Sequence, residues 1–326
     1  MTTTTTTTRR QVLVASAALL ATAGVSAQQA APWPAKPVKV IVGFAAGTPP
    51  DVFARLYGEY AAKKLGQPFV IDNKPGSAGN LATDAVAKST DGYTVLYNVS
   101  TAFTINPSIY GKLPFDPAKD LVPVATTMRQ GLVLIAGPQF QADSVKALLE
   151  QARAKPGTIS HASYGSGSPS HLIMEWFKDE TKTTMIHVPY RTSPISDLLG
   201  GQVDTVLEPM ASAYPLIAAG KVKPLAYSGE QRHPAMPNVP TFAEVVPGLS
   251  MMSWHGIWAP ASMPPAVVEQ LHATLLAASQ DPDMQRRIKE LNSEPLGASR
   301  QEMSAMVKRD SEIYGRIVKA KNIRVD

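Results

Sequence analysis

The residues of this chain that could do chemistry lie mainly in two loops that are rich in glycine and hydroxyl side chains. The first loop spans residues 43–51, the second spans residues 161–171, and each follows a short apolar run. Glycine permits backbone angles that turn N–H groups outward, and serine adds a hydroxyl donor. A loop that leads into a helix also lies at the positive end of the helix dipole. Both loops therefore favour the binding of a carboxylate or a phosphate.

The first loop also fits an ordinary connection between a strand and a helix. Pro49 and Pro50 cannot donate backbone hydrogen bonds, so two N–H groups are missing from any anion site there. No histidine or second carboxylate is close to Asp51 in the sequence, so we expect Asp51 to be the helix N-cap rather than an acid or base. The second loop carries four serines between His161 and His171 and is the stronger anion site.

Motifs for catalysis, metal binding and nucleotide binding are missing from the sequence. No serine of the second loop has glycine two residues before and after it, so the loop is not a nucleophile elbow. The Gly-Lys pairs at 111–112 and 220–221 lack the serine or threonine that completes a Walker loop. The six histidines show no metal-ligand spacing, and the absence of cysteine excludes thiol chemistry. We expect no enzymatic activity, no metal and no cofactor.

Some aromatic and histidine side chains leave two interpretations open. Phe103, Trp254 and Trp258 could line a cleft, although buried packing is the commoner position for such residues. His171 is best interpreted as a residue on a helix face close to the second loop, with ligand contact as the alternative.

The first 27 residues resemble an export signal. Arg9 and Arg10 precede an apolar run over residues 12–25, and Val25-Ser26-Ala27 supplies the small residues needed for cleavage after Ala27. The paired arginines favour twin-arginine export over the Sec route. The apolar run is shorter than the roughly 20 residues of a spanning helix, which argues against a membrane anchor. We therefore expect a periplasmic protein.

Length and charge limit the remaining possibilities. Removal of 27 of the 326 residues leaves 299, enough for two domains of about 150 residues each. The net charge falls from +5 to +3 because two arginines leave with the signal. The basic residues are scattered, so nucleic acid is not expected as a partner. The small basic excess is compatible with an anionic ligand.

Short β-branched runs alternate with amphipathic stretches, which predicts an α/β fold with mostly parallel sheets flanked by helices. The expected strands are 38–42, 69–71, 94–97, 132–135, 159–162, 185–188 and 205–207. The expected helices are 51–65, 80–88, 144–154 with Ser144 as N-cap, 172–177, 195–199, 265–280, 282–291 and 300–319.

An ordered series of motifs resembles the Bug family, the periplasmic solute receptors of tripartite tricarboxylate transporters. Residues 43–51 are similar to its Pro-Phe-Pro-Pro-Gly-Gly-x-x-Asp loop, and residues 73–80 to its Asn-Arg-Pro-Gly-Ala-Gly-Gly-Asn turn. Further matches follow in the family's order at 91–94, 106–117, 162–171 and 188–204. Each match alone is weak, but the series is specific and covers nearly all of the mature chain.

The resemblance implies a two-lobed Venus-flytrap fold, the periplasmic-binding-protein fold, in which the chain crosses between lobes twice. Residues 28–126 and 252–326 would form one lobe and residues 127–251 the other. A carboxylate would be held between the lobes by the two loops, partly through bridging waters. Hinge closure would then bury the ligand and present it to the membrane permease subunits. Receptors of this family usually act as monomers.

The resemblance also assigns candidate ligand contacts. The residues expected to hold one carboxylate, or to lie close to it, are Phe44, Gly47, Thr48, Asp51, Ser163, Gly165, Gly167, Ser168 and His171. The candidates for the far end of the ligand are Ser100, Thr101, Phe103, Tyr190 and Arg191.

This chain departs from the family pattern in the first loop. Gly43 replaces a proline, Thr48 replaces the second glycine, and Pro49-Pro50 replace a pair that usually includes a hydroxyl. A bulkier or aromatic acid is one ligand compatible with these changes. Two other functions stay open, namely a receptor that presents its ligand to a periplasmic sensor protein and an exported enzyme on a similar scaffold.

Overall fold

The computed structural model describes residues 33–190 and 192–325 of the chain. Residues 1–35 and 36–326 form two separate units, and the second contains all the elements described below. The predicted export signal and Arg191 lie outside the described residues.

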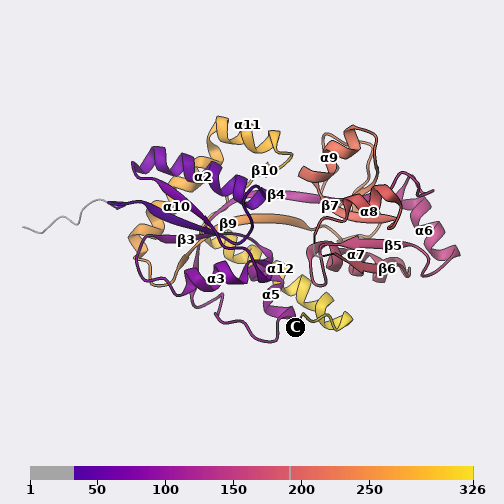
Figure 1. The fold of residues 1–326 in the computed structure, drawn as a ribbon, viewed down its shortest axis with the longest axis horizontal. Coiled ribbons are helices and arrows are strands. Elements are labelled where there is room, and N and C mark those ends of the chain that lie inside the picture. The colour runs from indigo at the N-terminus through magenta and orange to yellow at the C-terminus, as the bar shows by residue number, and fades with distance from the viewer. Residues whose placement is uncertain (1–32, 191, 326) are drawn as a thin grey trace, which may run out of the picture. The chain divides into compact units, whose positions relative to one another are not determined.

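Three parallel strands with helical crossovers form the first part of this unit (Figure 1). The elements are β1 (Val38–Val42), α2 (Pro49–Leu65), β2 (Phe69–Asn73), α3 (Asn80–Ala87) and β3 (Thr94–Val99). β1 pairs in parallel with both β2 and β3, so the strand order is β2-β1-β3. Parallel neighbours need a crossover connection, which α2 and α3 supply. The predicted bounds of these five elements are confirmed to within two residues.

A second parallel set follows later in the chain. Its elements are β5 (Ser160–Ser163), α7 (Pro169–Thr181), β6 (Ile186–Pro189), α8 (Ile195–Gly200), β7 (Thr205–Pro209), α9 (Met210–Ala218) and β8 (Lys223–Tyr227). β5 pairs in parallel with β6 and β7. The sequence pattern did not indicate α9, because Pro215 inside it interrupts the helical pattern.

Two long antiparallel strands connect the parallel sets. β4 (Leu121–Ala136) pairs with β9 (Met252–Pro260) from Leu121 to Gly131, and with β7 and β8 from Leu132 onward. The complete order is β2-β1-β3-β9-β4-β7-β5-β6, with β8 and the two-residue β10 (Glu294–Pro295) also paired to β4. The predicted parallel pairing is confirmed for the outer strands, while the sequence pattern indicated only the last part of β4 and missed β9.

The remaining helices include α4 (Thr101–Thr104), α5 (Asn106–Ile109), α6 (Val145–Ala154), α10 (Pro265–Gln280), α11 (Pro282–Glu290) and α12 (Arg300–Lys321). Ser144 is confirmed as the N-cap of α6, since its side chain accepts a hydrogen bond from the backbone of Ala147. Within the described part of the chain, no helix combines the length and the apolar character needed to cross a membrane.

The alternating side chains of β4 bury both faces of the sheet. Leu132 and Leu134 pack in a core cluster with residues of α6 and α7, whereas Val133 and Ile135 pack in another with residues of α8 and α9. Successive strand residues point to opposite faces, so a strand covered on both sides needs an unbroken apolar run. This explains why the run at 132–135 was recognisable from the sequence.

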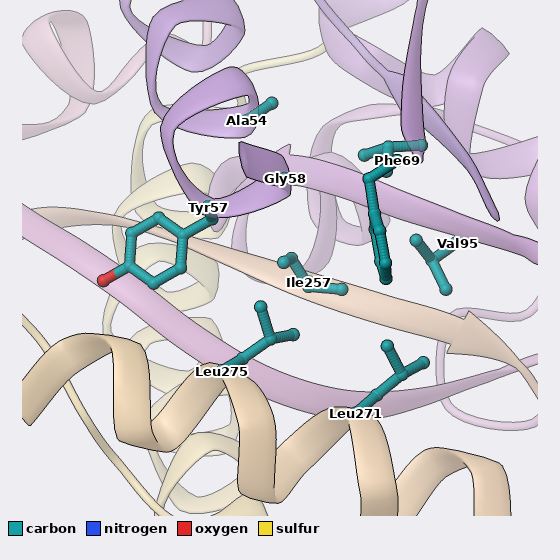
Figure 2. Close-up of a pocket in the computed structure, with 9 residues that line it drawn as sticks. Ala54, Tyr57, Gly58, Phe69, Val95, Ile257, Leu271 and Leu275 are labelled. Atoms are coloured by element: carbon teal, nitrogen blue, oxygen red, sulfur yellow. The ribbon is translucent and has the colours of Figure 1, made fainter. Parts of the chain in front are cut away.

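A small cavity lies between α2, the sheet and α10 (Figure 2). Its volume is about 10 Å³, and Leu271 and Leu275 point into it from α10. Tyr57 of α2 also lines it, with its hydroxyl donating a hydrogen bond to the carbonyl of Thr127. Because this volume is no larger than the space for one water molecule, the cavity is a packing gap and not a ligand site.

Gly131, at the point where β4 changes partners, tests how tightly the sheet is packed. A methyl group there would lie 2.3 Å from the ring of Tyr227, which is buried and equally close to the position of a methyl group on Gly229. The ring therefore cannot move aside, and we expect Gly131→Ala to lower the free energy of unfolding by about 1–3 kcal/mol.

Urea denaturation measures this loss. Gly111→Ala is the matched control, since a methyl group there meets nothing within 4 Å, and we expect it to change stability by less than about 0.5 kcal/mol. Equal stabilities of the two variants would contradict the packing described for Tyr227.

Candidate functional site

The strand directions bring the two predicted loops toward each other. β3 and β4 are both antiparallel to β9, so β3 runs in the same direction as β4, whereas β7 runs against it. Val99, the last residue of β3, aligns through His255 with Met128 of β4, and Pro209, the last residue of β7, pairs with Leu132. The two strand ends therefore point at each other and are separated by four residues of β4, or about 13 Å. The loops that follow the parallel strands face one another across this interval.

Asp51 organises the first loop. Its carboxylate accepts hydrogen bonds from the backbone N–H of Gly47 at 2.9 Å, from Asn73 at 2.9 Å and from Arg55 at 3.0 Å. Burial by itself would raise the pKa of Asp51, but the hydrogen bonds from Arg55, Gly47 and Asn73 outweigh it and lower that pKa. The carboxylate is therefore ionised and links the loop to α2 and β2.

The expectation that Asp51 is the N-cap of α2 is wrong. The helix begins at Pro49, so Thr48 is the N-cap residue and Asp51 lies in the first turn. The Thr48 hydroxyl makes no cap bond and donates instead to the carbonyl of Ala45 at 2.6 Å. Two prolines at the helix start shift the boundary by two residues, because proline suits the first helical turn.

The turn at residues 73–80, which resembles a family motif, lies next to the first loop. Ser77 and Ala78 both have left-handed backbone angles, with φ of 47° and 51°, which are costly for residues other than glycine. Asn106 holds this turn by donating to the carbonyl of Ala78 and to the side chain of Asn80. Strained backbone of this kind is common at functional sites, but no sequence pattern predicts it in a serine or an alanine.

The second loop is tied down by side chains beneath it. Ser163 Oγ lies 2.6 Å from His187 Nε2, and the N–H of Gly167 donates to His171 Nδ1 at 3.0 Å. Ser168 is the N-cap of α7, where its hydroxyl accepts from the N–H of His171 and donates to the carbonyl of Gly165. Several of the predicted donors therefore form hydrogen bonds within the protein in this structure.

Three histidines form a stack behind this loop. The rings of His171 and His187 lie 3.7 Å apart and nearly parallel, and His161 stacks on His187 at 5.0 Å. Burial lowers the pKa of His187 to about 4 and also lowers that of His161, so these two rings are neutral at physiological pH. Glu175 lies 3.6 Å from His171 Nε2 and is also paired with Lys178. The stack thus joins the second loop to α7.

The family model for "Tripartite tricarboxylate transporter family receptor" matches residues 53–323, which is most of the chain. The chain belongs to this receptor family. Protein BugT of Bordetella pertussis is 36% identical over 267 residues, covering 80% of this chain and 82% of that protein. The UPF0065 protein in the tcbD-tcbE intergenic region of Pseudomonas sp. (strain P51) is 34% identical over 306 residues, covering 92% and 90%.

Solved structures of similar receptors share the fold. R. palustris Rpa4515 with adipate has a TM-score of 0.82 and 32% identity, covering 90% of this chain and 99% of that one. MatC of Rhodopseudomonas palustris with bound malate has a TM-score of 0.76 and 28% identity, covering 88% and 100%. The predicted family and α/β receptor fold are thereby confirmed.

The residues predicted to contact the far end of the ligand lie in different surroundings. Ser100 is buried at the end of β3, where its N–H donates to the carbonyl of Trp254, and Thr101 begins α4. Phe103 stacks on Trp258 at 4.0 Å within a core cluster, which supports the packing interpretation of these aromatics. Tyr190 donates its hydroxyl to Asp197 at 2.7 Å.

Near the facing strand ends, the receptor exposes both polar and apolar groups that are candidates for ligand contact. In the first loop, the exposed residues Ala45 and Ala46 have backbone N–H groups that make no hydrogen bond within the described part of the chain. Val52 and Leu81, in the first turns of α2 and α3, expose 38% and 51% of their surface. Among the described residues no group of His, Asp and Glu side chains is arranged to hold a metal ion.

Asp51→Asn tests the organisation of the first loop. An amide cannot accept from all three partners, so we expect the variant to lower the free energy of unfolding by about 1–3 kcal/mol at neutral pH. The ion pair with Arg55 contributes only a small part of this loss, because solvent screens the half-exposed Arg55 side chain. The lowered pKa stabilises the fold above the unfolded value near 3.8, and this contribution is lost as pH falls through the folded pKa. The difference between variant and parent should therefore shrink in acid.

Chemical denaturation at neutral and acid pH measures both effects. Asp72→Asn is the control, because Asp72 is exposed on the neighbouring strand β2, and its replacement should leave stability within about 0.5 kcal/mol. If the stability difference between Asp51→Asn and the parent stayed constant down to acid pH, the Asp51 carboxylate would not be the ionised group that organises the loop.

Proposed function

We propose that this receptor binds a small carboxylate between the two facing loop sets and acts in the periplasm. The observation that carries the proposal is the convergence of strand ends and helix starts. Helices α2 and α3 begin at the ends of β1 and β2, and α7 and α9 begin at the ends of β5 and β7. Helix N-termini attract anions, and ligands of open α/β sheets bind beyond the carboxyl ends of the strands.

The ligands bound by related receptors support a small carboxylate as the ligand class. The similar structures from Rhodopseudomonas palustris contain adipate and malate, and both compounds are small carboxylates. We propose that the exposed N–H groups of Ala45 and Ala46 contribute donors from one side of the site. Ser163, Gly165, Gly167 and Ser168 would contribute from the other side, partly through water, because their direct donors are already bonded within the protein.

We further propose that ligand binding closes a hinge between two lobes, residues 28–126 with 252–326 and residues 127–251. The proposed crossings fall close to the changes in strand pairing, since β4 exchanges β9 for β7 and β8 after Gly131 and β9 starts at Met252. The closed form would then deliver the ligand to the permease subunits of a tripartite transporter.

A thermal-shift screen tests the ligand class directly. The mature protein would be heated with adipate, malate and succinate, and with the neutral diamides of adipate and succinate as controls. A carboxylate present at 100 times its dissociation constant should stabilise the fold by about 2.7 kcal/mol, because it binds only the folded state. The matched diamides should give no shift. Stabilisation by diamides or other neutral compounds alone would refute the proposal.

Serine variants test the second loop as a binding element. Ser163→Ala should weaken the affinity for a carboxylate by about 0.5–1.5 kcal/mol, the net value of one hydrogen bond. Ser168→Ala should do the same and also cost about 1 kcal/mol of stability, since Ser168 caps α7. Calorimetry measures affinity, with Ser304→Ala on the exposed face of α12 as control. Unchanged affinity in both loop variants would remove this loop from the site.

A further inference from the structure

A buried carboxyl group lies beside the second loop and is not among the ligand contacts proposed above. Glu208, the second-to-last residue of strand β7, is 1% exposed. Both of its carboxylate oxygens lie 2.8 Å from the hydroxyl of Tyr164. Tyr164 follows Ser163 in the second loop and exposes 40% of its surface. Glu208 therefore contacts Tyr164, the residue that follows the proposed ligand contact Ser163.

The strand register explains this position. β5 and β7 are parallel neighbours, with Ala162 opposite Val206, so Tyr164 and Glu208 lie in step two residues further on. Both residues are thus at the carboxyl edge of the second parallel set, the edge that faces β3. The carboxylate of Glu208 lies at the same edge of the sheet as the loop donors.

The hydrogen bonds of Glu208 leave acceptor capacity unused. An ionised carboxylate offers about four lone-pair sites. Its donors in the described part of the chain are the hydroxyls of Tyr164 and Ser212, which carry one proton each. Among the described residues, no lysine, arginine or histidine forms an ion pair with Glu208. A ligand group that donates a hydrogen bond would complete the set.

The charge of Glu208 also discriminates between ligands. Burial raises the pKa of Glu208 to about 7, although the hydrogen bonds from Tyr164 and Ser212 act in the opposite direction. The ionised form repels a second carboxylate of a ligand, whereas it accepts strongly from a hydroxyl or an ammonium group. A simple dicarboxylate would therefore lack the group that this position favours.

We propose that Glu208 selects ligands that carry a hydroxyl or ammonium group in addition to a carboxylate, and that this group donates to a lone pair of the Glu208 carboxylate that Tyr164 and Ser212 leave unused. The inference rests on the proposed function, since it concerns a second contact in the same site. It assigns the ligand to the hydroxy acids or amino acids within the wider class of small carboxylates.

Matched pairs of ligands test the proposal by calorimetry. Malate differs from succinate by one hydroxyl, and ε-aminocaproate differs from caproate by one ammonium group. In the parent protein, at least one donor-bearing member should bind about tenfold or more tightly than its partner, as expected for one hydrogen bond to a charged group. In Glu208→Gln, which keeps the shape and removes the charge, the preference should fall by a similar factor, and the affinity of the partner should not fall.

A pH profile of the parent protein provides a test that needs no variant. Glu208 meets Tyr164 from the second loop, Ser212 from α9 and Val133 from β4. Burial raises the pKa of Tyr164 far above neutrality, so Glu208 is the group of this set that titrates between about pH 6 and about pH 8. The affinity for the donor-bearing ligand should rise over that interval as Glu208 ionises. The affinity for its partner should not rise.

The possible results separate the two proposals. If none of the four carboxylates binds, the proposed function fails. If carboxylates bind but neither pair shows a preference, or if the preference survives in Glu208→Gln and does not change with pH, the role of Glu208 is refuted and the receptor function stands.

Discussion

The opposed direction of two sets of parallel strands along β4 is the constraint on which the candidate site depends. β3 reaches its end opposite Met128, and β7, which runs the other way, reaches its end at Leu132. Strand ends, the loops that follow them and the helices that begin there must accordingly meet near the middle of β4. In the proposed site, each loop set would supply donors from one side only.

The two loop sets of the candidate site are held in place by different means. The first is held by a single ionised group, Asp51, which draws together a backbone N–H, an amide and a guanidinium. The second rests on stacked imidazole rings, two of which burial keeps uncharged, and on the cap of α7. Loops fixed in this way would lose little conformational freedom on binding the proposed ligand, which favours affinity.

Much of the fold could be predicted from the sequence, and the reasons for the exceptions are physical. The strand at residues 132–135 is apolar on both faces and was recognisable, whereas residues 121–131 include buried Thr126, Thr127 and Gln130, so no apolar run marked that part of β4. The loops were found because glycine and serine are visible in sequence. Glu208 was missed because its importance comes from burial and from a partner 44 residues away. The strain at Ser77 and Ala78 likewise exists only in the folded chain.

The position of β9 between β3 and β4 has a consequence for the order in which the chain can fold. Residues 38–136 contain β1, β2, β3 and β4, yet β9, the strand that connects β3 to β4 in the sheet, is residues 252–260. While the chain emerges from the ribosome, β3 and β4 therefore stay unconnected until nearly four fifths of the chain is present. Contacts between segments so far apart in sequence form slowly, since a long loop must close first. A chain built in this order therefore completes the pairing between β3 and β4 only late in synthesis.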